Sequence, residues 1–257
     1  MTDLKKEQIE KILRDGVRNK FKKYKPKLTA KPFHTRLLGK DRLALFSLIQ
    51  SLNTNFGTTI FEPVALVLAK DNFKIAKRQV SIGKRITVEA QTVIQNIIDD
   101  LVSKKKKSSK HEEIELIKKA CRSKNTKEIK PTKVDIMLER ENGELFLIDI
   151  KTAKPNAGEV KGFKRTLLEW TAVALLQNPN VKINTLIAIP YNPSEEEPYA
   201  RWTTNDMLDS NDELKVAEDF WDFLGGGNTY QDLLDCFEKI GAELKDEINA
   251  FFSKFPT

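Results

Sequence analysis

The chain has 257 residues, 40% of them hydrophobic, so it is long enough to bury a sizeable core as one large domain or two smaller ones. Two histidines and two widely separated cysteines, Cys121 and Cys236, argue against a zinc site, a disulfide framework and a histidine-based nucleophile. The absence of any run of ~18 apolar residues and of an apolar leader argues against a transmembrane helix and a signal peptide, and predicts a cytoplasmic protein without a membrane partner.

The net charge of +7 is unevenly distributed along the chain. Residues 1–42 carry 14 basic and 5 acidic side chains, and residues 104–133 carry 12 and 4, whereas residues 191–257 carry 5 and 16. Two basic blocks and one acidic end suggest a side that faces a polyanion and a side that faces solvent or a partner. The alternative is a solvated surface with uneven residue usage.

The N-terminal half is predicted to be mostly helical. Residues 3–22 place apolar side chains at helical spacing, and residues 40–55 form a second helix that is apolar enough to be core. Gly57 is expected to end this helix, and Thr58 and Thr59 to begin another that runs to about Lys70.

Glu62 has two interpretations. The segment Thr59-Ile60-Phe61-Glu62 has the pattern of a capping box, in which the glutamate reaches back to the Thr59 amide. The other interpretation, a carboxylate that completes a catalytic site, rests on the family resemblance given below. Further along, residues 72–86 predict a short strand or hairpin, residues 87–102 a helix, and residues 104–109 a charged loop.

A β-hairpin is the most informative feature of the sequence. Two apolar, β-prone runs, residues 133–138 and 144–151, flank a turn that contains Asn142-Gly143. Asp135, Asp149 and Lys151 interrupt these runs, and a buried strand that carries charges must pair them or use them. Asp149 and Lys151 are two residues apart and therefore share a face of the strand.

These three residues suit metal-assisted phosphodiester hydrolysis. Two carboxylates can hold a hard divalent cation such as Mg²⁺, which keeps its other positions for water and phosphate oxygens. The Ile150 carbonyl is placed to be a further ligand, and Lys151 could orient the attacking water. The alternative is an ordinary surface ion pair between Asp149 and Lys151, which would contribute at most about 1 kcal/mol.

The turn geometry decides whether the carboxylates meet. A two-residue Asn142-Gly143 turn would place Asp149 opposite Ile136, and Asp135 would face away. A three-residue loop, Glu141-Asn142-Gly143 with Gly143 in the left-handed region, would pair Asp135 with Asp149. We predict the three-residue register or an equivalent shift.

A polar loop over residues 152–158 and a helix over about 159–177 follow the hairpin, and residues 181–189 form a third buried strand. The helix begins with three basic side chains on one face, and the loop adds two polar candidates for contacts with phosphates. These candidates are Lys154, Asn156, Lys161, Lys164 and Arg165.

The order strand, strand, helix, strand predicts an α/β fold, with a mixed central sheet whose antiparallel catalytic hairpin is flanked by helices. We expect a single domain over residues 1–257: a mostly helical part (1–103), the catalytic core (131–190) and an acidic helical part (191–257). In the last part, helices are expected over about 212–224 and 229–253, with Gly225-Gly226-Gly227 as a helix stop between them.

The hairpin residues carry a family resemblance. Asp135, followed after the turn by Asp149-Ile150-Lys151, resembles the PD-(D/E)XK nuclease signature, although Val134 stands where that signature has proline. Three further segments resemble the TdeIII-like family of type II restriction endonucleases, and the likeness covers nearly the whole chain. These segments are Phe33 to Arg42, Ser51 to Thr54 with Phe61-Glu62-Pro63, and Asp219 to Gly226.

The resemblance implies a restriction-endonuclease-like domain that cuts double-stranded DNA with Mg²⁺. It implies that Asp135 and Asp149 bind the metal, that Lys151 is the catalytic lysine and that Glu62 completes the site. It further implies a homodimer, a short G/C-rich palindromic target of the GGNCC kind and a cognate DNA methyltransferase as functional partner. Additional basic candidates for DNA contact are Arg36, Lys40 and Arg42.

Two alternatives remain open from the residues. One is a basic DNA-binding protein without catalysis, in which the Asp-x-Lys pair is structural. The other is a repair or junction nuclease with the same core, which would recognise DNA structure rather than sequence.

Overall fold

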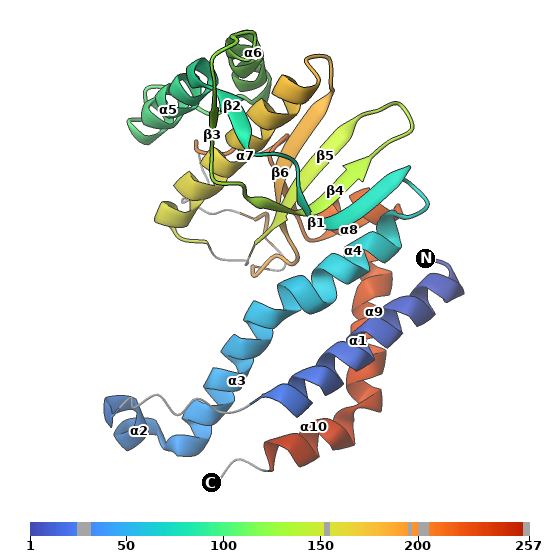
Figure 1. The fold of residues 1–257 in the computed structure, drawn as a ribbon. Coiled ribbons are helices and arrows are strands. Elements are labelled where there is room, and N and C mark those ends of the chain that lie inside the picture. The colour runs from blue at the N-terminus through green and yellow to red at the C-terminus, as the bar shows by residue number, and fades with distance from the viewer. Residues whose placement is uncertain (25–31, 152–154, 195–196, 200–205, 254–257) are drawn as a thin grey trace. The chain divides into compact units, whose positions relative to one another are not determined.

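The chain forms two compact units (Figure 1). A helical unit comprises residues 1–67 and 226–257, and a sheet unit comprises residues 68–225. The computed structural model describes residues 1–24, 32–151, 155–194, 197–199 and 206–253. The N-terminal and C-terminal segments of the chain therefore belong to one unit, whereas the expectation of a single domain stays a prediction.

The helical unit is built from the two ends of the chain. Its helices are α1 (Asp3–Lys23), α2 (Pro32–Leu38), α3 (Lys40–Phe56), α4 (Glu62–Ala69, which runs on into the sheet unit), α9 (Thr229–Glu243) and α10 (Lys245–Phe252). The helix α1 packs lengthwise against α9, and Phe21 stacks on Phe251 of α10 with ring centroids 4.2 Å apart. Helical periodicity in the sequence predicted most of these segments correctly.

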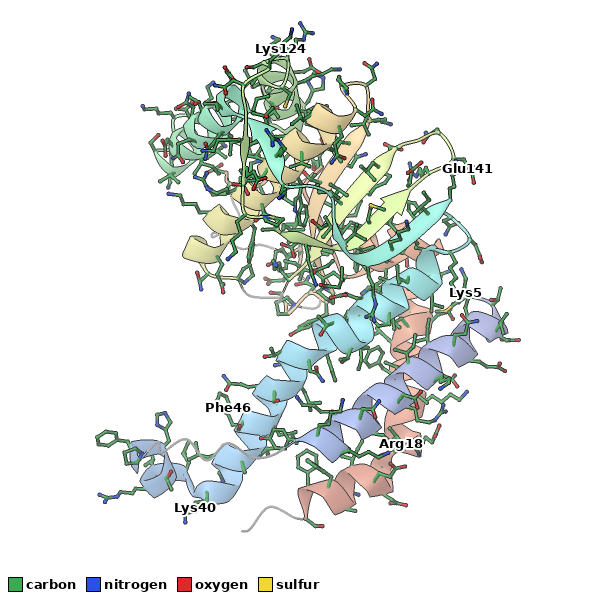
Figure 2. All side chains as sticks on the ribbon, viewed as in Figure 1. Lys5, Arg18, Lys40, Phe46, Lys124 and Glu141 are labelled. Carbon is green, nitrogen blue, oxygen red and sulfur yellow. The ribbon has the colours of Figure 1, made fainter. Side chains whose placement is uncertain are left out.

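The basic N-terminal helix and the acidic C-terminal helices neutralise part of each other's charge. Arg14 in α1 binds Glu243 with Nε to Oε1 at 2.7 Å, and Arg18 binds Glu247 with Nη2 to Oε1 at 2.6 Å. Arg18 extends from α1 on the side of α10 (Figure 2). Such exposed pairs contribute little to stability, because water and salt screen them. Part of the basic block at residues 1–42 is therefore paired with acidic side chains of the same molecule, which the composition alone did not indicate.

The helix α3 does not end at Gly57 as expected. It continues through a π-helical turn, η1 (Gly57–Phe61), directly into α4. Thr59 lies inside this turn, where its hydroxyl donates to the Asn55 carbonyl at 2.6 Å, so Thr59 is not a helix N-cap. The capping-box interpretation of Glu62 is therefore wrong, because no helix begins at Thr59.

The helix α3 is also less buried than its composition suggested. Leu48 is fully buried, but Leu45, Phe46 and Ile49 are exposed, and half of the Phe46 surface is accessible. The neighbouring short helix α2 contributes the exposed Phe33 to the same unit. The expectation that α3 is entirely core is therefore only half right.

The sheet unit contains a five-stranded mixed sheet in the order β1-β4-β5-β6-β7. The strands are β1 (Ile75–Ser81), β4 (Lys133–Glu139), β5 (Leu145–Ile150), β6 (Ile183–Ile189) and β7 (Leu214–Val216). The pairs β1-β4 and β4-β5 are antiparallel, and β5-β6 and β6-β7 are parallel. A mixed sheet with an antiparallel hairpin at its centre confirms the predicted architecture.

Helices cover both faces of this sheet. On one face lie α5 (Val88–Val102), α6 (Lys110–Ala120) and α7 (Ala157–Gln177), whose apolar side chains form one core with Leu147 and Ile187. On the other face α8 (Glu218–Gly225) brings Phe223 against Phe146, with ring centroids 5.2 Å apart. None of the helices in the described part of the chain combines the length and the apolar composition needed to span a bilayer.

Four elements of the sheet unit were not expected. The helix α6 follows the charged loop, and a small antiparallel pair joins β2 (Arg85–Thr87) to β3 (Thr126–Glu128). The predicted helix over residues 212–224 is wrong in its first half, because Leu214–Val216 form the edge strand β7 and α8 begins only at Glu218. Short strands of three residues carry too little periodicity to be recognised from sequence.

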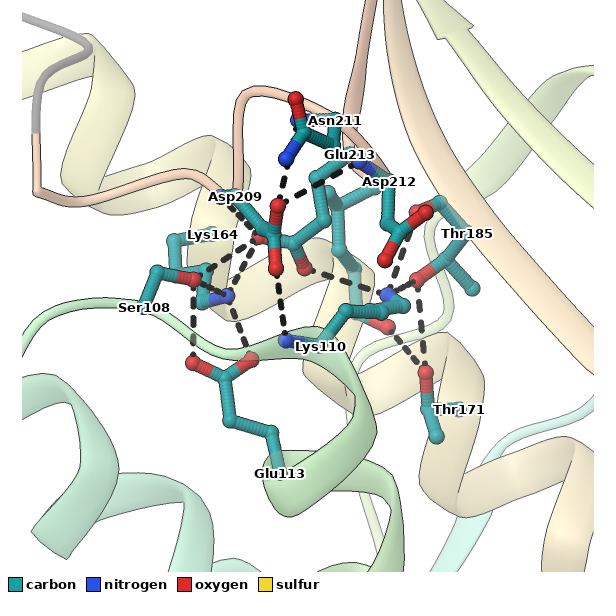
Figure 3. Close-up of polar contacts among 11 residues, drawn as sticks. Ser108, Lys110, Glu113, Lys164, Thr171, Thr185, Asp209, Asn211, Asp212 and Glu213 are labelled. Atoms are coloured by element: carbon teal, nitrogen blue, oxygen red, sulfur yellow. Dashed lines mark hydrogen bonds and ion pairs between the residues drawn. The ribbon is translucent and has the colours of Figure 1, made fainter.

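A buried ionic cluster fastens α6 and α7 to the loop before β7 (Figure 3). Lys164 of α7 is 0% exposed, and its ammonium lies 2.5 Å from both Glu113 Oε2 and Glu213 Oε2. Lys110 lies 3.1 Å from Glu213 Oε1 and also donates to the Thr185 hydroxyl and carbonyl. Two ammonium groups and two carboxylates from three segments, α6, α7 and the loop before β7, thus share one buried site.

Burial and charge act against each other in this cluster. Burial lowers the pKa of Lys110 and raises the pKa of Glu113. Burial also disfavours ionised Glu213, but the adjacent Lys110 and Lys164 outweigh that effect and hold the pKa of Glu213 below its usual value. Breaking one member of such a group leaves an uncompensated buried charge, which is strongly destabilising.

The cluster corrects one prediction. Lys164 was expected to contact DNA phosphates from the start of α7, but its side chain is fully buried and points away from solvent into the cluster (Figure 3). Its neighbour Lys161, three residues earlier, is exposed. Helical spacing places both near one side of α7, and only the packing of α6 against that side decides which of them is free to contact a ligand.

We expect Lys164→Met to lower the free energy of unfolding of the sheet unit by about 3–5 kcal/mol, because Glu113 and Glu213 would lose their shared ammonium. All three tryptophans lie within residues 68–225, so urea unfolding followed by tryptophan fluorescence reports on this unit. The exposed Lys161→Met is the matched control and should change stability by less than about 0.5 kcal/mol. Equal midpoints for Lys164→Met and the wild type would contradict the assignment.

Candidate active site

The β4-β5 register places the candidate carboxylates opposite each other. Ile136 pairs with Ile148 and Glu139 with Leu145, and one more step along the same register brings Asp135 opposite Asp149. At the other end, the Arg140 N–H donates to the Glu144 carbonyl at 3.0 Å. The hairpin is therefore closed by three residues, 141–143, with Glu141 at its tip (Figure 2).

Local chemistry explains why the loop has three residues. Gly143 has φ +79°, a left-handed conformation that glycine adopts at little cost, and its N–H donates to the Arg140 carbonyl at 2.9 Å. The Asn142 side chain accepts from the Glu144 N–H at 3.0 Å and stabilises the turn. The predicted three-residue register, with Gly143 in the left-handed region, is confirmed.

The Asp135 carboxylate is held by two donors from the neighbouring strands. Its Oδ2 accepts from the Ile150 N–H at 2.9 Å, and its Oδ1 accepts from the Gln79 side-chain amide at 3.1 Å. Because residues two apart share a face, Asp135 and Asp149 lie on the face of Met137 and Leu147, which pack into the core beneath α7. The site therefore opens on the α7 side of the sheet.

Asp149 and Lys151 form a close, partly buried pair. The Lys151 ammonium lies 2.6 Å from Asp149 Oδ1, and Asp149 is only 6% exposed. The same ammonium lies 5.0 Å from the centre of the Phe163 ring in α7. Asp135, Asp149 and Lys151, which the sequence analysis selected, are thus brought together. The aromatic ring limits where the lysine can lie.

Burial raises the pKa of Asp149 to about 7. The Lys151 ammonium opposes this shift. The Asp135 carboxylate adds to it, because two carboxylates in one partly buried site repel each other when both are ionised. One lysine does not balance two carboxylates. A further positive charge at this place would favour the ionised form of both acids.

The donor set suits a hard divalent cation. Within the described residues no group of three or more histidine, cysteine, aspartate or glutamate side chains is placed to hold a metal ion, so the protein would supply two carboxylates here. Mg²⁺ commonly takes only one or two carboxylates and fills its other positions with water and phosphate oxygens. The crowded carboxylates of Asp135 and Asp149 fit that pattern, and the Ile150 carbonyl as a further ligand stays a prediction.

The fourth predicted catalytic residue belongs to the other unit. Glu62 begins α4 in the helical unit and is 2% exposed there. Its backbone N–H continues the helical hydrogen bonding by donating to the Gly57 carbonyl. A role for Glu62 beside Asp135 and Asp149 stays a prediction.

The predicted DNA contacts occupy different environments. Asn156 is the N-cap of α7 and forms a capping box with Glu159, and Arg165 donates to the Gln95 side chain of α5 at 2.6 Å. Lys161 is exposed, as are Arg36, Lys40 and Arg42 on α2 and α3. Lys154 lies outside the described residues.

Sequence reasoning missed two residues at this site. Gln79 of β1 and Phe163 of α7 contact Asp135 and Lys151, respectively, but nothing in their local sequence distinguishes them from ordinary strand and helix residues. Gln79 lies 56 residues from its partner. Only the pairing of β1 with β4 reveals its contact.

Comparisons with known proteins point to one enzyme class. A family model described as "Type II restriction endonuclease, HinfI" matches residues 1–241. The type II restriction enzyme HgiCII of Herpetosiphon aurantiacus is 25% identical over 224 residues, which cover 85% of this chain and 80% of that enzyme. The type II restriction enzyme MjaII of Methanocaldococcus jannaschii is 28% identical over 227 residues, which cover 83% of this chain and 60% of that enzyme. A resemblance to type II restriction endonucleases is confirmed, and the narrower TdeIII-like assignment stays a prediction.

We expect Asp149→Asn to stabilise the metal-free protein above neutral pH. An aspartate with a folded pKa of about 7 contributes stability that is fully present below its unfolded pKa of ~3.9 and lost as the pH rises through 7. With a chelator present at pH 8, the free energy of unfolding of the variant should be about 1–3 kcal/mol higher than that of the wild type. One pKa unit corresponds to about 1.4 kcal/mol, and the loss of the Lys151 partner offsets part of the gain.

Urea unfolding followed by tryptophan fluorescence at pH 4 and pH 8 measures this difference. The gap between Asp149→Asn and the wild type should close at pH 4, and the exposed Asp99→Asn should show no such pH dependence. A variant that is less stable than the wild type at pH 8 would contradict the raised pKa.

Proposed function

This chain belongs to the HinfI family of type II restriction endonucleases, and we propose that it hydrolyses DNA phosphodiesters with Mg²⁺ bound by Asp135 and Asp149. The observation that carries the proposal is the three-residue hairpin register, which brings these two carboxylates and Lys151 to one place. The proposed ligands are the two aspartates and the Ile150 carbonyl. When bound, Mg²⁺ would supply Lewis acidity and lower the pKa of a coordinated water.

Lys151 orients the attacking water in this proposal. An ammonium group has three donors and no acceptor, so in its charged form it positions a water oxygen and balances developing negative charge, but it does not remove a proton. Its place is fixed by Asp149 on one side and by the Phe163 ring on the other. Lys151 therefore needs no large reorganisation to act beside the carboxylates.

Basic side chains outside the site would hold the DNA backbone. Lys161 lies one turn into α7 and remains exposed, and Asn156 stands at the N-terminus of that helix, where backbone amides favour anions. Lys154 and Arg165 are proposed to assist them, and Arg36, Lys40 and Arg42 to contact DNA from the helical unit. Glu62 is proposed as a further carboxylate of the site.

The remaining proposals follow from the substrate. A short palindromic duplex presents two equivalent half-sites, which a two-fold homodimer matches. A G/C-rich target of the GGNCC kind and a cognate DNA methyltransferase, which would protect the cell's own DNA, rest on the resemblance to the TdeIII-like enzymes. We propose that the enzyme acts on DNA in the cytoplasm.

Digestion of a methylation-free plasmid tests the proposed chemistry. The wild type should give discrete fragments with Mg²⁺ and none with chelator. Asp149→Ala should lose about 10³-fold or more in cleavage rate, since a cation ligand contributes several kcal/mol of transition-state stabilisation. Lys151→Ala should lose on the order of 10²–10³-fold, as expected for removing a positioned donor. Glu115→Ala on the exposed face of α6 is the matched carboxylate control.

The outcomes separate the alternatives. DNA binding without cleavage by the wild type would favour a non-catalytic binding protein, and cleavage at DNA junctions without discrete plasmid fragments would favour a structure-specific nuclease. Sequencing the fragment ends tests the GGNCC proposal, and sedimentation of the free protein tests the homodimer.

A further inference from the structure

Gln79 occupies an unusual backbone position beside the proposed metal site. Within β1, Arg78 pairs with Ile136 and Val80 pairs with Val134, so the register places Gln79 directly opposite Asp135. Gln79 itself has φ +54°, in the left-handed region that residues other than glycine, asparagine and aspartate rarely adopt. The regular strand is thus distorted at the residue that faces a candidate metal ligand.

The side chain of Gln79 contacts that ligand directly. Its Nε2 donates to Asp135 Oδ1 at 3.1 Å, while Asp135 Oδ2 accepts from the Ile150 N–H at 2.9 Å. The carboxylate is therefore held from both sides, by a side-chain amide of β1 and by a backbone amide of β5. With one donor on each oxygen, rotation of the carboxylate about its Cβ–Cγ bond is restricted.

Strained backbone that persists next to a functional group is a sign of a positional requirement. Glycine would relieve the strain at residue 79 but has no side chain, and asparagine tolerates the left-handed region but has a shorter one. The sequence instead has glutamine, whose amide reaches Asp135. The contact offers a physical reason for keeping a longer side chain in an unfavourable conformation.

We propose that Gln79 is a positioning residue that orients the Asp135 carboxylate for cation binding, an inference that rests on the proposed function. With Oδ1 and Oδ2 each held by a donor, the remaining lone pairs of Asp135 keep a fixed direction toward the cation site that Asp149 shares. Partners of this kind orient metal ligands, and their removal typically costs 10–100-fold in metal affinity or activity. Gln79 does not contact the reacting atoms.

Two substitutions with opposite backbone effects test the proposal. Gln79→Gly removes the amide and relieves the left-handed strain, whereas Gln79→Met removes the amide and keeps the strain with a side chain of similar length. If Gln79 positions Asp135, both variants should need a 10–100-fold higher Mg²⁺ concentration for half-maximal cleavage. At saturating Mg²⁺ their cleavage rates should approach that of the wild type.

Stability separates positioning from a merely structural role. Gln79→Gly should unfold at the same urea concentration as the wild type or higher, even though its metal dependence is impaired. Gln79→Asn accepts the left-handed conformation, but its shorter side chain does not bring the amide to Asp135, so it should also need more Mg²⁺ than the wild type. Ala217→Gly is the matched control: Ala217 has φ +48°, so glycine relieves its backbone without removing a polar group, and metal dependence should not change.

Calorimetric titration of Mn²⁺ into the full chain without DNA gives a second readout that needs no cleavage. A wild-type protein that neither binds Mn²⁺ nor cleaves DNA would overturn the proposed function itself. If the wild type binds Mn²⁺ and cleaves DNA, and the Gln79→Gly and Gln79→Met variants have the same Mg²⁺ dependence and Mn²⁺ affinity as the wild type, this inference alone is overturned. If only one of the two variants folds, that variant decides the question in the same way.

Discussion

The pairing of β4 with β5 is the constraint on which the candidate site depends. Side chains alternate between the two faces of a strand, so a shift of one residue would move Asp135 to the opposite face from Asp149. The shift is prevented at the far end of the hairpin, where Gly143 adopts a left-handed conformation and donates to the Arg140 carbonyl. A single turn glycine thereby determines whether two carboxylates several residues away can share a cation.

The sheet unit contains two buried groups of charges that are balanced differently. In the cluster of Lys110, Lys164, Glu113 and Glu213, two ammonium groups face two carboxylates, and the group joins α6 and α7 to the loop before β7. At the candidate site, Lys151 pairs with Asp149, the Asp135 carboxylate lies beside this pair, and the pKa of Asp149 is raised. Charge balance suits a structural role, whereas an excess of negative charge leaves a place for a cation.

The ends of the chain illustrate how tertiary pairing changes the meaning of composition. The basic N-terminal block and the acidic C-terminal block suggest two separate surfaces when they are counted along the sequence. In the structure, α1 packs against α9, and Arg14 and Arg18 pair with Glu243 and Glu247. The exposed basic residues of α2 and α3, such as Lys40, are among those of the first block that these pairs leave available (Figure 2).

Local signals allowed the sequence by itself to determine much of the fold and the central part of the site. Helical periodicity located α1, α5 and α7, and Asn142-Gly143 located the hairpin. Its three-residue register was predicted from the requirement that Asp135 and Asp149 share a face. Those signals act between residues close in the chain, so they can be read without knowing the rest of the structure. Asp135, Asp149 and Lys151 were identified because charges interrupt two apolar strands.

The tertiary structure decided the contacts between distant segments. The burial of Lys164 depends on Glu113 and Glu213, which lie 51 and 49 residues away, and the Gln79 contact with Asp135 spans 56 residues. No local sequence pattern identifies such pairs, because lysine, glutamate and glutamine also occur on solvated surfaces. Which lysine is buried, and which amide holds the Asp135 carboxylate, follow only from how the helices and strands pack.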